Sequence, residues 1–113
     1  MRVAFILKGD PFSWKSHEAI RIALAMGINH QVDLILLKDG VYTFTRWRPH
    51  DLGIEGLEKL LENMDYVAVR LIVEDTSAEE RGLKETDFVK KVEFMSVEDI
   101  KGLLQRAEAV LVW

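Results

Sequence analysis

Apolar residues in this chain gather in short runs, separated by stretches in which they recur at helical spacing. The runs have the length of β-strands and cover residues 2–8, 32–37, 66–73, 92–94 and 109–113. The first three are almost continuously apolar, which is typical of strands covered on both faces, as in a parallel sheet. Helical spacing predicts helices over residues 13–27, 54–64 and 96–107, with a shorter one over 76–82.

Strands that alternate with helices predict an α/β fold in which right-handed crossovers connect parallel strands. For a five-stranded parallel sheet of this length we expect a three-layer flavodoxin-like fold with strand order 2-1-3-4-5. The chain of 113 residues has room for one domain, and no linker or internal repeat divides residues 1–113.

Residues 41–48 (VYTFTRWR) depart from this alternation. Their β-branched and aromatic residues predict a strand or an extended arm, although no turn signal pairs the segment with a neighbour. Arginines beside aromatic residues could hold an anionic partner, but protein–protein contacts favour the same residues, and the negative net charge favours the second interpretation. The candidate interface comprises Tyr42, Phe44, Arg46, Trp47 and Arg48.

The loops after the first three strands are expected to meet at the carboxyl edge of the sheet, where open α/β sheets bind ligands. The candidate pocket there comprises Asp10, Ser13, Ser16, Asp39, Gly40, Glu74 and Ser77. The two serines that precede a helix could bind an anion through free backbone N–H groups, although helix capping alone explains them. The carboxylates could bind Mg²⁺, but acidic residues also form turns, and their spacing matches no metal motif. We therefore predict no metal site and no cofactor.

Composition narrows the classes of function. A net charge of −4 argues against general nucleic-acid binding, and the loop after the first strand lacks the glycine motifs of nucleotide-binding proteins. Because the chain has no cysteine, it cannot by itself form a disulfide, a thiolate nucleophile or a zinc–thiolate site. No segment resembles a signal peptide or a membrane span, so we expect a cytoplasmic protein. Few Asn and Gln residues beside many charged ones suit a thermophile.

Several short motifs occur in an order that resembles the DsrE/DsrF/DsrH-like family of sulfur-relay proteins, and the DsrF/TusC type in particular. The resemblance runs over nearly all of the chain. Its most specific pieces are the Asp39-Gly40-Val41 turn and the Arg81-Gly82-Leu83 motif. Further matches are Pro11 after the opening strand, Glu18-Ala19, the predicted helix over residues 53–63, and residues 107–113.

This resemblance implies a flavodoxin-like domain that assembles into dimers, trimers or hexamers. Family members with a reactive cysteine pass persulfide sulfur between proteins, in tRNA 2-thiouridine formation or in dissimilatory sulfur oxidation. In those members the cysteine follows the third strand, and the corresponding positions here hold Glu74 and Ser77. Neither a carboxylate nor a hydroxyl can form a persulfide, so we predict no catalytic residue. The DsrF/TusC-type subunit also lacks the carrier cysteine.

The leading hypothesis is therefore a non-catalytic subunit or homo-oligomeric relative of sulfur-relay complexes, which acts by assembly or by binding a partner. Its expected partners are copies of itself or cysteine-bearing DsrE-like paralogues, with no nucleic acid and no membrane. The alternative is a small-molecule or anion-binding protein that uses the pocket at the carboxyl edge. An enzyme acting through Ser77 or the carboxylates has the least support, because no recognisable motif supplies a base.

Overall fold

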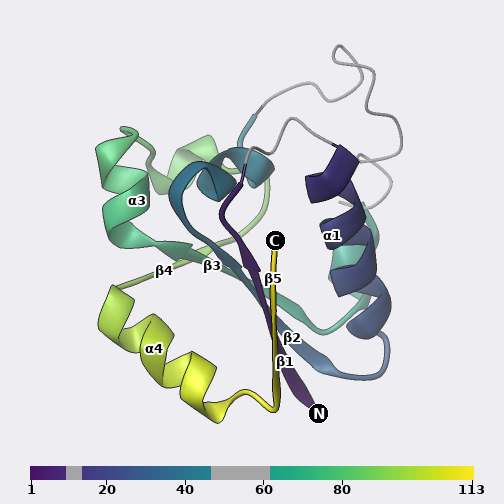
Figure 1. Ribbon diagram of the computed structural model, residues 1–113. Coiled ribbons are helices and arrows are strands. Elements are labelled where there is room, and N and C mark those ends of the chain that lie inside the picture. Colours follow the sequence, from purple (N-terminus) through teal and green to yellow (C-terminus); the bar gives the residue numbers. More distant parts are fainter. Residues whose placement is uncertain (10–13, 47–61) are drawn as a thin grey trace.

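Five parallel strands form one sheet in the computed structural model, which describes residues 1–9, 14–46 and 62–113 (Figure 1). The strands are β1 (Arg2–Leu7), β2 (Gln31–Leu36), β3 (Val69–Glu74), β4 (Glu93–Met95) and β5 (Ala109–Val112). The described α-helices are α1 (Trp14–Met26), α3 (Asp75–Glu80) and α4 (Val97–Arg106). The 3-10 helices among these residues are η1 (Lys38–Phe44), η3 (Met64–Tyr66) and η4 (Glu85–Asp87). The α/β class and the five-stranded parallel sheet of a flavodoxin-like fold are thus confirmed.

The strand order is β4-β3-β2-β1-β5, so the predicted order 2-1-3-4-5 is wrong. β3 pairs with β2, not with β1, and β5 pairs with the other side of β1. This places β2 in the middle of the sheet, whereas the prediction placed it at the edge. The burial of every residue from Val32 to Leu36 suits the central position, because a central strand is covered on both faces and by neighbours on both sides.

The direction of the connections decides which helix covers which face. From β1 to β4, each strand is added on the same side of the previous one, and only the connection from β4 to β5 returns across the sheet. Right-handed crossovers that run in one direction lie on one face, and a crossover that runs back lies on the other. Accordingly, α1 and α3 pack with η1 against one face, and α4 covers the opposite face (Figure 1).

Each face has its own apolar core. The larger core joins alternate strand residues, Phe5 and Leu34 among them, to Ala19 and Ile20 of α1 and to Phe44 of η1. The smaller core joins Ala4, Ile6, Ile35 and Ile72 to Ile100 and Leu103 of α4. Because successive strand residues point to opposite faces, one continuous apolar run supplies both cores.

The segment predicted as a strand or arm has another structure. Residues Lys38–Phe44 form η1, and Thr45 makes a single antiparallel bridge to Phe88. Val41 and Phe44 are fully buried in the larger core. Core packing of these apolar side chains therefore overrides the strand preference of a β-branched and aromatic sequence.

Helix boundaries agree with the sequence in part. Gly82 follows α3 with φ of +66°, as expected for a glycine that ends a helix, and Ser96 caps α4 by accepting a hydrogen bond from the Asp99 N–H. α3 begins at Asp75, so the predicted start at Thr76 as a helix cap is wrong. Most of the predicted helix over residues 54–64 lies outside the described residues.

No helix in the described ranges has the length and apolar character needed to cross a bilayer.

Candidate functional site

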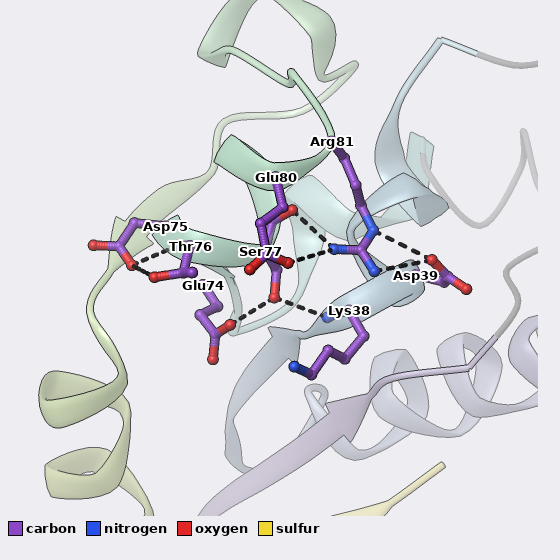
Figure 2. A network of polar contacts seen from close by, with 8 residues as sticks. All are labelled: Lys38, Asp39, Glu74, Asp75, Thr76, Ser77, Glu80 and Arg81. Carbon is purple, nitrogen blue, oxygen red and sulfur yellow. Dashed lines mark hydrogen bonds and ion pairs between the residues drawn. The ribbon is translucent and has the colours of Figure 1, made fainter.

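The candidate site lies at the carboxyl edge of the sheet, where the end of β2 leads into η1 and the end of β3 leads into α3. The two neighbouring strands bring η1 and α3 together, and the two helices are joined by polar contacts (Figure 2). The eight residues drawn there are Lys38, Asp39, Glu74, Asp75, Thr76, Ser77, Glu80 and Arg81.

The start of η1 is pressed against the end of β1. The Leu37 N–H donates to the Leu7 carbonyl over 2.9 Å, and the Gly40 N–H donates to the Leu37 carbonyl over 2.9 Å. A Cβ atom on Gly40 would lie 2.1 Å from the Leu7 carbonyl oxygen, which is far inside van der Waals contact. Lys38 adopts a φ of +51°, a left-handed conformation that is uncommon for lysine. The close packing of the turn therefore requires glycine at position 40. This steric requirement explains the residue without a role in a ligand pocket.

Ser77 connects the two turns through its hydroxyl group. The hydroxyl donates to Oε1 of Glu74 over 2.6 Å and accepts from the backbone N–H of Lys38 over 3.0 Å. The residue is 1% exposed, so its hydroxyl oxygen is shielded from water. A donor and an acceptor from two different loops thus meet at one buried oxygen.

Arg81 makes a second connection on the outer side of the same turn. Its Nε and Nη2 donate to Oδ1 of Asp39 over 3.2 and 3.1 Å, and its Nη1 donates to the Ser77 carbonyl over 3.1 Å. Nη1 also lies 3.7 Å from Oε2 of Glu80. The guanidinium is therefore engaged on three sides, and its charge is largely balanced by two carboxylates (Figure 2).

The arrangement suits a structural role better than a reaction. The Ser77 oxygen is buried and already hydrogen-bonded on both sides, whereas a nucleophile needs access to its substrate. In the described ranges no three His, Cys, Asp or Glu side chains gather closely enough to hold a metal ion. What the contacts achieve is a fixed relation between η1 and α3.

The structure brings together only part of the predicted pocket. Asp39, Gly40, Glu74 and Ser77 lie at the carboxyl edge as expected, whereas Asp10 and Ser13 lie outside the described residues. Ser16 is the third residue of α1 and is buried, so its alternative role as a helix cap is wrong.

Two participants were missed from the sequence. Arg81 and the backbone of Lys38 complete the network, yet nothing in their local sequence predicts contacts across more than 35 residues. The Arg81-Gly82-Leu83 motif was visible only as part of the family resemblance. Asp75 does not face the network, because its Oδ1 accepts hydrogen bonds from the backbone and hydroxyl of Thr76.

The candidate interface residues separate into different environments. Phe44 is fully buried, and Tyr42 is half-buried and packs against the larger core. Arg46 is exposed, whereas Trp47 and Arg48 lie outside the described residues. The prediction that all five residues form an exposed arm is therefore wrong for Phe44, because its ring is part of the larger core.

Comparison with known proteins adds one family and two related folds. The model of the DsrE/DsrF-like family matches residues 1–113. No curated protein matches the sequence. The ychN protein from E. coli is similar in structure, with a TM-score of 0.83 and 22% identity over 100% of this chain and 99% of that one. A protein of unknown function from Methanobacterium thermoautotrophicum is similar with a TM-score of 0.71 and 16% identity, over 99% of this chain and 98% of that one. At these identities the two structures support the fold alone.

Proposed function

Because the chain belongs to the DsrE/DsrF-like family, we propose that it is a non-catalytic subunit, or a homo-oligomeric relative, of a sulfur-relay complex. In this role it contributes a folded surface to an assembly that transfers persulfide sulfur, and a cysteine-bearing paralogue carries the sulfur. We place it with the DsrF/TusC type, the kind of subunit in which the carrier cysteine is absent.

One observation carries this proposal: the chain has the family fold but no sulfur nucleophile. It contains no cysteine at any of its 113 positions. Persulfide formation needs a thiolate, and the hydroxyl of Ser77 has neither the required chemistry nor access to solvent. A role in sulfur transfer must therefore be exerted through contacts with a protein that does carry a thiol.

The polar network supports a surface-based role because it holds the relevant turn in one shape. Ser77 and Arg81 each connect the β3–α3 turn to the start of η1. A binding surface that is already ordered loses less conformational entropy on association. The same contacts weaken the anion-binding alternative, because Arg81 is already paired with Asp39 and the hydroxyl of Ser77 with Glu74.

The test is a sulfur-loading experiment with two proteins. The purified chain is mixed with a cysteine-bearing DsrE-like protein from the same genome, which has been loaded with ³⁵S persulfide by a cysteine desulfurase. We expect label on the cysteine-bearing protein alone, co-elution of the two proteins, and faster delivery to an acceptor thiol when this chain is present. Label that is bound covalently to this chain and released by cyanide contradicts the proposal.

A further inference from the structure

An apolar groove lies beside α3, on the side away from the polar network. It encloses about 370 Å³ and is lined by Ala78 and Glu79 of α3, by the corner 82–85, by Asp75 and by Phe94 of β4. This volume is at the lower end of the range for ligand pockets, roughly 300–1,000 Å³, so it suits one large side chain with its neighbours.

One aromatic ring, that of Phe94, lines the groove. Phe94 is 39% exposed, although it lies on the same face of the sheet as the larger core. Its ring packs edge-to-face on buried Phe88, with ring centroids 5.9 Å apart and an interplanar angle of 75°. Leu83 packs partly against the core beside it. A phenylalanine held in this way offers one face of its ring to an incoming side chain without having to move.

The wall opposite the sheet is fixed by backbone hydrogen bonds. The Leu83 N–H donates to the Ala78 carbonyl over 2.9 Å, and the Gly82 N–H donates to the Glu79 carbonyl over 3.1 Å. This pattern, with Gly82 in the left-handed conformation, closes the end of a helix. The Lys84 N–H donates to Oδ2 of Asp87 over 2.7 Å and holds the next turn. The groove is therefore formed before any partner arrives.

The rim of the groove is acidic. Asp75, Glu79 and Glu85 line it together with a single cation, Lys84. Within the described residues, the carboxylates of Glu79 and Glu85 have no hydrogen bond or ion pair, and both residues are exposed. An exposed aromatic ring surrounded by unpaired carboxylates attracts a group that is apolar in the middle and positively charged at its ends.

We propose that this groove binds a segment of another protein in which one large apolar side chain is flanked by Lys or Arg. The apolar side chain packs on Phe94 and Leu83, and the flanking cations pair with Glu79 and Glu85. Within the described residues β4 has no neighbouring strand on its outer side, so the backbone of the segment can also lie along this edge. We commit to a different protein as the occupant because charge complementarity with the acidic rim calls for a basic segment, whereas this chain carries a net charge of −4. Self-association through another surface of the chain is compatible with this occupant. This inference rests on one part of the proposed function, namely that the chain acts by binding another protein.

The probe is a fluorescein-labelled peptide with the sequence Gly-Ser-Arg-Trp-Arg-Ser-Gly, titrated with the full chain and followed by fluorescence anisotropy. The control peptide has Glu in place of each Arg. We expect measurable binding of the first peptide, at least tenfold weaker binding of the second, and loss of affinity as salt rises. The double variant Glu79→Lys/Glu85→Lys should weaken binding at least tenfold, whereas Glu62→Lys/Glu98→Lys, with the same change in charge outside the groove, should weaken it less than threefold.

Phe94→Ser tests the apolar part and should weaken binding of the first peptide, with a thermal melt to show that the variant is folded. Equal binding of the two peptides, or no effect of Glu79→Lys/Glu85→Lys, overturns the proposal. If the chain alone self-associates and this double variant abolishes the association, the occupant is a second copy and the proposal of another protein is wrong. If the chain co-elutes with its cysteine-bearing paralogue but does not bind the peptide, the proposed function is retained and the proposal that the groove binds a basic segment is wrong.

Discussion

Replacing Ser77 by Ala removes the oxygen that joins the two turns of the candidate site. The change deletes a 2.6 Å hydrogen bond to Glu74 and leaves the Lys38 N–H without its 3.0 Å acceptor. The alanine Cβ takes the place of the serine Cβ and only the oxygen is removed, so the main loss is that of its two hydrogen bonds at a position that is 1% exposed.

The size of the effect follows from those partners. A hydrogen bond contributes about 0.5–1.5 kcal/mol net, and one to a charged group about 1.5–3 kcal/mol. Glu74 and the Lys38 N–H are both only partly buried, so water recovers some of each contact and the total falls to about 2 kcal/mol. For a chain between the usual 100-residue and 150-residue cases, this corresponds to a melting temperature about 6–12 °C lower.

Urea titration and thermal melting of Ser77→Ala measure this loss directly. The matched control is Thr76→Ala, since Thr76 is the neighbouring hydroxyl but is exposed, and within the described residues that hydroxyl hydrogen-bonds to Asp75 alone. We expect the control to change stability by less than about 0.5 kcal/mol. If Ser77→Ala costs no more than Thr76→Ala, the network does not hold the site together and the reasoning about its rigidity is refuted.

Three further predictions concern the same edge of the sheet. Gly40→Ala should lower the free energy of unfolding by about 3 kcal/mol or more in urea titration, because the added Cβ would lie 2.1 Å from the Leu7 carbonyl oxygen. The control Gly9→Ala adds a Cβ in open space and should be near neutral. Equal stabilities of the two variants would contradict the close approach of Gly40 to Leu7. In a thiol-reagent assay, Ser77→Cys should react at least a hundredfold more slowly than Thr76→Cys, because position 77 is buried and position 76 is exposed; similar rates would show that the site opens readily. A thermal-shift screen with inorganic phosphate and Mg²⁺ should leave the melting temperature unchanged, and a dose-dependent rise would favour the anion-binding alternative.

The strands could be predicted from the sequence because four of them are mostly apolar runs of strand length, and the fourth strand in the chain, β4, follows an alternating pattern over residues 92–94. The order of the strands could not, because an apolar run says that a strand is covered but not which strands lie beside it. The unbroken apolar run from Leu34 to Leu37 was nevertheless a usable signal, since it suits a central strand better than an edge strand. The position of β2 is where the prediction and the structure differ most.

The position of the site in the fold could be predicted, but the hydrogen bonds that connect its residues could not. Asp39, Glu74 and Ser77 were expected at the carboxyl edge because strand ends of a parallel sheet meet there. The hydrogen bond from the Lys38 backbone to Ser77 depends on a left-handed residue and on β2 lying next to β3, and neither is visible in the local sequence. Phe44 was predicted to lie on the surface because arginines follow it in the sequence, but its ring is buried in the larger core.

The measurement that tests the central claim most directly is the mass of the purified chain in solution by size-exclusion chromatography with light scattering. It is run on the chain alone and again after mixing with the cysteine-bearing DsrE-like protein from the same genome. We expect a mass of two or more chains of 13.0 kDa each for the chain alone, or a stable complex of defined stoichiometry with the second protein. A mass of one chain in both experiments, at all concentrations tested, would contradict a role in assembly.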